Sequence, residues 1–298
     1  MAQGVVVESK TTSQTYRPGE IEQAFQEFIN KYGKRYSTTE EYRVAKDAFA
    51  ENLRTIASLR ASGDLTHEVG LNEYADVPRE LLHESRKCVP DPKLRRLANS
   101  TFTRRVTATP PSSIDWEAAG ALAPIRDQKT LLNSCGCCYA ISTTVVMESR
   151  FKLATGISKV VPFSVQQIVD CSQPYGNEGC DGGSIDSSMH YLDVEGIVKS
   201  SSYPFKAKLG TCKTSVTSNP AKQCVKPTQF IYAYVPPEDE DAMMRDVATG
   251  PIAVSIYASA PSFEFYKSGI ITAKTCGVST PDHFVTIVGY GTSSTGIP

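Results

Sequence analysis

The sequence has few of the features that mark several large classes of protein. It has no continuous apolar run long enough for a transmembrane helix or a secretory leader. Positive and negative charges nearly cancel, at 31 and 32 residues, and the pI is near 6.4, so the net charge gives no indication of nucleic-acid binding. Histidine is scarce, with four residues in 298, which leaves few candidates for a general base.

Cysteine, by contrast, is plentiful. The chain has nine cysteines, and eight of them follow residue 130. This usage is typical of a domain that folds in an oxidising compartment and carries disulfides. The odd number leaves at least one thiol without an internal partner. Because such a chain normally enters the secretory route, we expect the N-terminus as given to be trimmed or incomplete.

The first part of the chain is polar and helical in pattern. After an extension at residues 1–19, residues 20–85 form a helical region that begins with an aromatic stripe at helical spacing, namely Phe25, Phe28, Tyr32 and Tyr36. A second amphipathic helix is expected to follow, with an apolar face of Val44, Ala48, Phe49, Asn52, Ile56 and Leu59. Residues 70–76 are expected to be extended and to lead into a further helix.

Residues 86–110 have no hydrophobic period and are rich in proline, serine, threonine and basic residues. This composition predicts an exposed linker that proteases can cut. The linker contains the sequon at Asn99, a candidate for N-glycosylation.

Residues 111–298 are more apolar and richer in glycine. A helix is expected from the cysteine cluster to Gly156, and a capping box at Ser164 and Gln167 begins another. The runs 229–235, 251–258 and 283–291 are β-rich and bounded by proline or glycine. This order predicts an α+β domain in which a helical lobe precedes a sheet-rich lobe, with a cleft between them as the natural place for a site.

The segment NSCGCCYA, residues 133–140, concentrates three cysteines at the start of the expected helix. Cys138 would lie at the helix N-terminus, where the helix dipole and free N–H groups stabilise a thiolate. His283, preceded by Asp282, opens a β-rich run far downstream. Their separation is typical of a papain-type cysteine and histidine, so the sequence predicts a cysteine nucleophile with a histidine base.

Five motifs in the same order resemble those of papain-family cysteine proteases of the cathepsin L type: SIDW (113–116), IRDQ (125–128), CGCCYA (135–140), GCDGG (179–183) and DHFVTIVGYG (282–291). The N-terminal region resembles the inhibitory propeptide of such enzymes. Its two motifs are represented by Glu41, Phe49, Asn52 and Ile56, and by Gly70, Asn72, Tyr74 and Asp76. Ala45 and Arg60 depart from the propeptide pattern.

The resemblance implies a two-lobe papain-like fold, with a helical left lobe and a β-barrel-like right lobe, preceded by a helical propeptide domain. Residues 20–85 would be the inhibitory domain, 86–110 the activation segment and 111–298 the peptidase domain. The chain would be a zymogen of a cysteine endopeptidase. It would act on peptides or proteins as a monomer, with its own propeptide as inhibitor and without a nucleic-acid or membrane partner. Its location would be lysosomal, vacuolar or extracellular.

The resemblance also implies a role for each catalytic residue. Cys138 would attack the scissile carbonyl as a thiolate, and His283 would carry the proton to the leaving amine. The side-chain amide of Gln128 and the backbone N–H of Cys138 would bind the oxyanion. An acyl-enzyme would form and be hydrolysed, and no metal or cofactor is expected.

The remaining cysteines follow from the same resemblance. Cys135 would pair with Cys180, and Cys171 with Cys212. Cys276 would pair with a cysteine beyond the end of this chain, or with Cys224. Cys137 has two interpretations: a vicinal disulfide with Cys138 that disables the nucleophile, or a small buried thiol.

Substrate contacts are implied for both sides of the cleft. Gly182 and Gly183 would let an extended peptide approach the backbone closely. A pocket for the side chain preceding the scissile residue would be lined by Ile185, Ser255, Pro281, Asp282 and Phe284. The bulky Phe284 would shorten this pocket and favour small side chains, unless the ring is buried in the sheet core instead.

Three features support a rival interpretation. The chain stops before the family's asparagine motif, four residues (129–132) are added before the cysteine cluster, and Cys137 stands where the family usually has a small serine. Tyr139 also replaces the usual tryptophan, which the family signature tolerates. The rival is a papain-fold pseudoprotease that binds peptides without cutting them. A structural metal site is disfavoured, because CGCC lacks a second ligand pair at zinc spacing.

Overall fold

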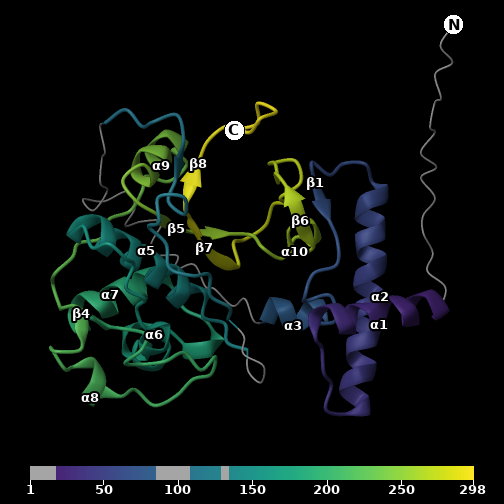
Figure 1. The fold of residues 1–298 in the computed structure, drawn as a ribbon, viewed down its shortest axis with the longest axis horizontal. Helices are drawn as coiled ribbons and strands as arrows, with labels where there is room; N and C mark the ends of the chain where they lie inside the picture. The colour runs from purple at the N-terminus through teal and green to yellow at the C-terminus, as the bar shows by residue number, and fades with distance from the viewer. Residues whose placement is uncertain (1–17, 85–107, 129–133) are drawn as a thin grey trace, which may run out of the picture. The chain divides into compact units, whose positions relative to one another are not determined.

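The computed structural model describes residues 18–84, 108–128 and 134–298 (Figure 1). Residues 1–17 of the N-terminal extension, Cys88, Asn99 and the expected insertion at 129–132 lie outside the described residues, and the last two residues of the expected extension, 18 and 19, belong to a helix. The chain separates into two compact units. Unit 1 combines the residues up to His83 with Tyr257–Thr280, and unit 2 combines Glu84–Ile256 with Pro281–Pro298.

Two helices form the core of unit 1: α1, Pro18–Tyr32, and α2, Thr39–Ala61. The Phe25 ring contacts Phe49 at 5.2 Å between centroids and Tyr36 at 5.9 Å. The predicted aromatic stripe is therefore confirmed, although Tyr36 lies beyond the end of α1. Helix α2 begins at Thr38, whose hydroxyl accepts a hydrogen bond from the Glu41 N–H at 3.1 Å. This is an ordinary N-cap, and it explains where the helix starts.

The two residues of α2 that depart from the propeptide pattern have different surroundings. Ala45 is 6% exposed and packs into the aromatic core, whereas Arg60 is exposed. Arg60 donates two hydrogen bonds, at 3.1 and 2.7 Å, to the carbonyl of Val69. The Asn52 amide donates to the carbonyls of Ala75 and Val77 at 3.0 and 3.1 Å. Val44, expected on the apolar face, is exposed instead.

The expected extended piece at residues 70–76 is wrong. The strand β1, His67–Val69, ends before it, and the Asn72 side chain accepts from the Tyr74 N–H at 3.1 Å to form a local turn. Strand β1 pairs antiparallel with β6, Tyr266–Gly269, which is distant in sequence. Two short helices complete unit 1: α3, Arg79–Glu84, and α10, Pro261–Glu264.

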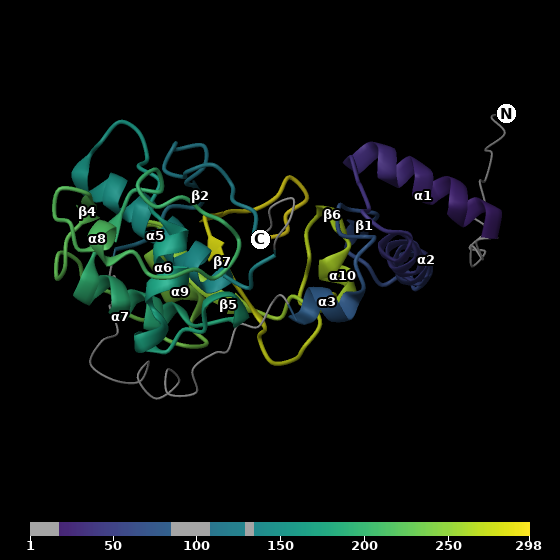
Figure 2. The same ribbon diagram turned by 90° about the horizontal axis from the view of Figure 1, so that it is seen from below.

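In unit 2, helices α6, Val165–Cys171, and α7, Ile185–Glu195, pack against the central helix α5, Cys138–Thr155 (Figure 2). Helix α5 ends at Gly156, whose φ of 68° is the left-handed conformation that glycine adopts freely, as predicted. Shorter elements are η1 Gln173–Tyr175, η2 Gly179–Asp181, α8 Thr214–Thr217 and α9 Glu240–Val247. Ser164 caps α6 by accepting from the Gln167 N–H, but the Gln167 side chain bonds Val198 and Gly196, so only half of the capping box forms.

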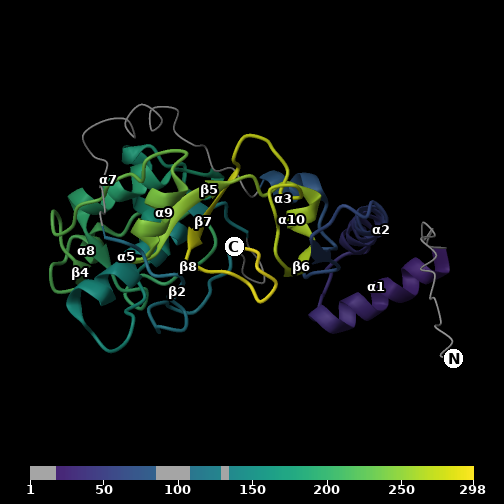
Figure 3. The same ribbon diagram turned by 90° about the horizontal axis from the view of Figure 1, so that it is seen from above.

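Three two-stranded sheets complete unit 2 (Figure 3). Strand β5, Ile252–Ile256, pairs antiparallel with β7, His283–Ile287, and β7 also packs on α5. Strand β2, Ile114–Asp115, pairs with β8, Gly289–Tyr290, and β3, Ile197–Val198, with β4, Gln223–Val225. The mixture of helices and sheets confirms the α+β class. No helix in the described part of the chain has the length and apolar character to cross a bilayer.

The strand expected at residues 229–235 is wrong. In this segment the Phe230 ring contacts Tyr232 at 6.5 Å between centroids, and the Tyr232 ring contacts Tyr234 at 6.4 Å. The intervening Ile231 is 97% exposed. The alternation of apolar residues is therefore present, but the segment forms no ladder in the described structure, and alternation alone does not make a strand.

Candidate active site

The predicted nucleophile and base lie at the first residues of two elements that pack together. Cys138 begins α5 and is 2% exposed, and His283 begins β7 and is half-buried. His283 faces Ile256 across the β5–β7 pair, and the neighbouring Asp282 N–H donates to the Ile256 carbonyl at 3.0 Å. The backbone at His283 and at the residue before it is thus held to β5.

The helix and the strand are also joined by a buried hydroxyl. Ser142, 2% exposed, lies one turn after Cys138 on α5. Its Oγ donates to the Val285 carbonyl at 2.8 Å and lies 3.0 Å from Oγ1 of Thr286. The four helical residues from Cys138 to Ser142 rise about 6 Å, and two strand residues span about 6.6 Å. Cys138 and His283 therefore lie at similar distances from the Ser142–Val285 hydrogen bond, measured along α5 and β7. We call this hydrogen bond the Ser142 tether; the sequence motifs did not reveal it.

The three cysteines of the cluster are in two chemical states: Cys135 and Cys138 are disulfide-bonded, and Cys137 is a free thiol. Cys138 takes part in a disulfide in this structure. Cys137 carries a free thiol and is fully buried, so a vicinal disulfide between the two is wrong and the alternative of a small buried thiol holds. Burial raises the pKa of Cys137 to about 12, so this thiol stays protonated and unreactive. Cys224 and Cys276 also carry free thiols, which excludes a bond between them.

Two disulfides fix the surrounding loops. Cys135 is bonded to Cys180, and Cys171 to Cys212. Beside the first of them, the Gly136 N–H donates to the Cys180 carbonyl at 2.8 Å. Tyr139, which replaces the family's tryptophan, is fully buried and donates its hydroxyl proton to the Gly179 carbonyl at 2.7 Å. The cysteine loop and the GCDGG loop are therefore joined by a covalent bond and two hydrogen bonds.

Gln128 lies in a loop that is bonded to the cysteine cluster. Its side-chain amide donates to the Cys135 carbonyl at 3.1 Å, and the Cys135 N–H donates back to the Gln128 carbonyl at 3.2 Å. The extra residues that separate Gln128 from this cluster do not prevent its amide from reaching the segment just before Cys138.

A buried ion pair anchors the same loop. Arg126, two residues before Gln128, pairs with Glu148 on α5, whose side chain is 1% exposed. The same carboxylate accepts from the Phe163 N–H. Burial raises the pKa of Glu148, and the charge and hydrogen bond of Arg126 oppose this shift without cancelling it. Sequence reasoning missed this pair, since a lone Glu in an apolar helix has no motif around it.

The raised pKa of Glu148 gives a pH dependence of known sign. Between the ordinary carboxyl pKa and the raised one, the folded chain binds more protons at this site than the unfolded chain, so this site's contribution to the free energy of unfolding falls as pH rises. In a Cys138→Ala background, which prevents self-cleavage, we expect the protein with Glu148 to lose stability relative to Glu148→Gln as the pH rises above the ordinary carboxyl pKa of about 4.3. Urea titrations of both proteins measure it. A difference that stays constant with pH would contradict this assignment.

The last two glycines of GCDGG, Gly182 and Gly183, are required by the fold itself. Gly182 has φ of 122°, which strains other residues. A Cβ on Gly183 would lie 2.4 Å from Oδ1 of Asn177. Asn177, 3% exposed, binds the Ser184 N–H at 2.8 Å and the hydroxyls of Ser172 and Ser188, and so fixes the loop before α7. Sequence reasoning missed Asn177, because its partners become neighbours only in the fold.

The predicted substrate pocket falls partly on the β5–β7 pair. Ser255 and Phe284 face each other across it, and Asp282 lies next to His283. Ser255 is exposed, Ile185 at the start of α7 is half-buried, and Phe284 is 7% exposed. The Phe284 ring belongs to the same buried cluster as Cys138 and Tyr139. Core packing of this ring is therefore observed, and its effect on substrate choice stays a prediction.

In unit 1, the second propeptide motif surrounds buried charges. Asp76, 7% exposed, accepts from Nζ of Lys34 at 2.8 Å and from the Tyr36 hydroxyl at 2.9 Å. The Asn72 amide donates to the Glu264 carbonyl at 2.6 Å, and the Gly70 N–H donates to Phe265 at 2.8 Å. These bonds join the motif to the segment 257–280, which follows β5 in sequence.

Glu264 is the main ionic contact between these two stretches of unit 1. Its side chain is 1% exposed, and its two oxygens contact Nε of Arg79 at 2.7 Å and Nε2 of His83 at 2.9 Å. Exposed pairs accompany it, including Lys267 with Glu68 at 3.0 Å. No motif marks Glu264, since its partners lie far away in the sequence.

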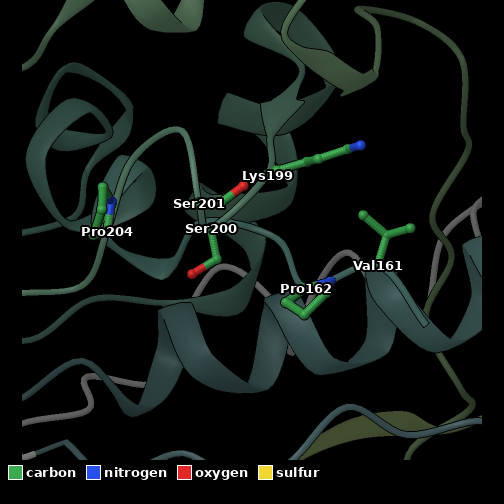
Figure 4. A pocket seen from close by; sticks show the side chains of 6 residues that line it. All are labelled: Val161, Pro162, Lys199, Ser200, Ser201 and Pro204. Atoms are coloured by element: carbon green, nitrogen blue, oxygen red, sulfur yellow. The ribbon is translucent and has the colours of Figure 1, made fainter. Parts of the chain in front are cut away.

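A pocket of about 420 Å³ lies elsewhere in unit 2 (Figure 4). It is lined by residues of two neighbouring segments, Val161, Pro162, Lys199, Ser200, Ser201 and Pro204. None of these six residues is a predicted catalytic or substrate-binding residue.

Comparison with known proteins accounts for most of the chain. The model of the papain family cysteine protease matches residues 110–297, and that of the cathepsin propeptide inhibitor domain matches residues 25–80. The chain belongs to the papain family of cysteine proteases. Cathepsin L of Sarcophaga peregrina is 33% identical over 291 residues, covering 93% of this chain and 81% of the relative. Cathepsin L1 of Drosophila melanogaster is 34% identical over 284 residues, covering 90% and 72%.

Solved papain-family precursors have the same fold. Digestive procathepsin L 3 from the larval midgut of Tenebrio molitor superposes with a TM-score of 0.77 at 27% identity, covering 92% of this chain and 85% of the other. A recombinant stem bromelain precursor gives 0.76 at 28% identity, covering 93% and 84%. The chain is thus a cathepsin L-like cysteine protease zymogen with an inhibitory propeptide, which confirms the predicted fold and enzyme class over the pseudoprotease.

The Ser142 tether predicts an effect on turnover in this papain-family enzyme. Ser142→Ala removes the bond to β7, and we expect kcat to fall about 10- to 100-fold with a smaller change in KM, because a shift of about 1 Å between reacting groups costs this much. The control is Thr144→Val, since the Thr144 hydroxyl is also buried but bonds Ile141 within α5 at 2.8 Å. Steady-state kinetics and the pH profile of both variants are compared; equal profiles would contradict a positioning role.

Proposed function

We propose that Cys138, His283 and Gln128 form the catalytic centre of this endopeptidase. The observation that carries the proposal is the packing of α5 on β7, which begin with Cys138 and His283 and are tied together at Ser142. The helix N-terminus and a neighbouring imidazolium both favour the thiolate over the thiol. The pair can therefore be reactive at acidic pH, where ordinary thiols are protonated.

Catalysis then proceeds through two transfers. The Cys138 thiolate attacks the scissile carbonyl, and the oxyanion receives hydrogen bonds from the Gln128 amide and the Cys138 N–H. His283 gives its proton to the leaving amine as the C–N bond breaks. Water, deprotonated by His283, attacks the thioester, and the acid product leaves with regeneration of the thiolate. The Gln128 amide, now bonded to Cys135, must turn toward the substrate for the first step.

Cys138 must be reduced before it can act. A sulfur in a disulfide cannot act as a thiolate nucleophile. The form seen here is therefore latent for two reasons, the disulfide at Cys138 and the inhibitory propeptide. Cys135–Cys180 and Cys171–Cys212, in contrast, hold the loops around the site and should remain intact in the active enzyme.

The proposal extends to organisation and context. Residues 20–85 act as the inhibitory domain, 86–110 as the segment cut on activation and 111–298 as the peptidase domain. The enzyme acts on peptides and proteins as a monomer in a lysosomal, vacuolar or extracellular setting. The number of cysteines and the two structural disulfides support an oxidising site of folding.

Hydrolysis of paired peptides tests the function and its specificity together. The chain is mildly reduced, processed at acid pH and given fluorogenic peptides that differ only in Phe or Val before the scissile residue. We expect cleavage of both without a strong preference for Val, because the Phe284 ring is packed in the core cluster with Cys138 and Tyr139. A strong preference for Val would show that the ring limits the pocket after all, and no cleavage after verified reduction of Cys138 would contradict the protease.

A further inference from the structure

Helix α5 contacts two other parts of the proposed site in addition to carrying the nucleophile. Cys138 is its first residue, and the Ser142 tether joins the helix to β7. Further along, Glu148 pairs with Arg126, which lies two residues before Gln128. An α-helix rises about 1.5 Å and turns about 100° per residue, so Glu148 lies about 15 Å along the axis from Cys138. Three parts of the proposed site are therefore held by one rigid element.

The segment that leads to Gln128 has few other polar contacts. Residues 122–126 belong to no helix or strand, and no backbone hydrogen bond joins them to another described residue. Ile125 is 97% exposed, so its side chain provides no hydrophobic anchor. The Arg126 side chain, in contrast, is only 18% exposed, and its Nη2 donates to Oε1 of Glu148. This ion pair is therefore the polar contact that fixes the segment to α5.

Burial makes the two charges depend on each other. The Glu148 side chain is 1% exposed, and its Oε1 also accepts from the N–H of the fully buried Phe163. Its Oε2 and Nη1 of Arg126 are buried and have no hydrogen-bond partner among the described residues. Water therefore cannot replace either partner, and the low dielectric strengthens the attraction between them. Loss of one charge would leave the other buried and unpaired.

The backbone of Gln128 is held from both directions. Arg126 fixes the chain before it, and the Cys135 N–H donates to the Gln128 carbonyl at 3.2 Å. The side-chain amide can then turn from the Cys135 carbonyl toward the substrate while the backbone stays in place. This matters because an oxyanion donor is effective only when it lies about 2.7–3.1 Å from the oxyanion.

We propose that Arg126 and Glu148 are positioning residues for the reaction, which hold the loop of Gln128 at a fixed place relative to Cys138. Neither residue touches the substrate, and both act through the Gln128 amide. Because the nucleophile and Glu148 lie on the same helix, a movement of α5 carries the nucleophile and the oxyanion donor together. The inference rests on the proposed function of Gln128 as an oxyanion donor.

A double-mutant cycle between Arg126→Gln and Gln128→Ala tests this role in the reduced, acid-processed enzyme. Rates are expressed per active site titrated with an irreversible thiol-directed peptide inhibitor, so misfolded molecules are not counted. Gln128→Ala should lower kcat about 100- to 1000-fold. Arg126→Gln should lower kcat about 10- to 100-fold with a smaller change in KM, because misplacement by about 1 Å costs this much. In the double variant, Arg126→Gln should add almost nothing, since its effect passes through the amide already removed.

Two further variants separate positioning from general stability. Arg126→Lys should recover most of kcat, because a single guanidinium nitrogen makes the contact and an ammonium can replace it as a point charge. Arg150→Gln is the control: Arg150 also lies on α5, but it donates to the carbonyls of Pro251 and Gly250 at 2.9 and 3.0 Å. Its kcat per titrated site should stay within a factor of two or so.

The possible failures can be told apart. An unchanged kcat in Arg126→Gln, or a loss that multiplies in full with that of Gln128→Ala, would overturn the positioning role and leave the oxyanion assignment intact. Equal losses in Arg126→Gln and Arg150→Gln would also overturn it. If Gln128→Ala itself leaves kcat unchanged, the oxyanion assignment is wrong, and the positioning role is wrong with it.

Discussion

Replacing Cys138 with alanine is expected to reduce peptide hydrolysis about a million-fold, to the level left by binding and oxyanion contacts alone. His283→Ala should cause a loss of similar size, and the double variant should be no worse than either single one. This non-additivity follows because thiolate and imidazolium act as one unit in every step.

The matched control is Cys224→Ser. Cys224 carries a free, half-buried thiol in the same unit, on strand β4 rather than at a helix N-terminus. Burial raises its pKa, so it is a poor nucleophile, and its replacement should leave kcat/KM within a factor of two or so. Activity of Cys138→Ala above the detection limit of the assay would show that a group other than Cys138 carries out the reaction.

The second large effect concerns latency. Glu264→Gln weakens the charge-assisted bonds to Arg79 and His83, and we expect it to destabilise the contact between residues 18–84 and 257–280 by about 2–4 kcal/mol. Because this contact holds the propeptide motif in unit 1, the full chain should process itself faster and at higher pH. The measurement is the time course of propeptide release after reduction, at a series of pH values.

Glu68→Gln is the control for Glu264→Gln. Both carboxylates join the same two stretches of unit 1, but Glu68 and its partner Lys267 are about half exposed, and solvent screening makes exposed ion pairs weak. Release should therefore change little. If both variants accelerate release equally, burial of Glu264 is not what makes its contact important.

Sequence patterns predicted the elements that are stabilised locally. The α6 cap at Ser164, the end of α5 at Gly156 and the aromatic stripe around Phe25 all depend on neighbours a few residues apart, and the structure has them. The proposed catalytic residues Cys138 and His283 were also chosen from the sequence, because a motif marks each side chain independently of the other.

The features that sequence reasoning missed depend on contacts between distant segments. Glu264 meets Arg79 and His83, Ser142 meets Val285, and Asn177 shapes the loop around Gly183. Gly183 shows the difficulty well: its motif was explained by the approach of a peptide, whereas the side chain that forbids a Cβ there is Asn177. The segment 229–235 has the alternation of a strand, but a strand also needs a partner, which alternation does not specify.

Selective alkylation of Cys138 tests the central claim most directly. The zymogen is treated with limiting iodoacetamide at about pH 5.5, with and without prior mild reduction and acid processing, and the labelled cysteine is located by peptide mass spectrometry. We predict labelling of Cys138 only after reduction, with Cys137 unlabelled because its pKa is raised to about 12. If Cys138 stays unlabelled after reduction, or labels no faster than Cys224, the thiolate–imidazolium pair does not form and the catalytic assignment is wrong.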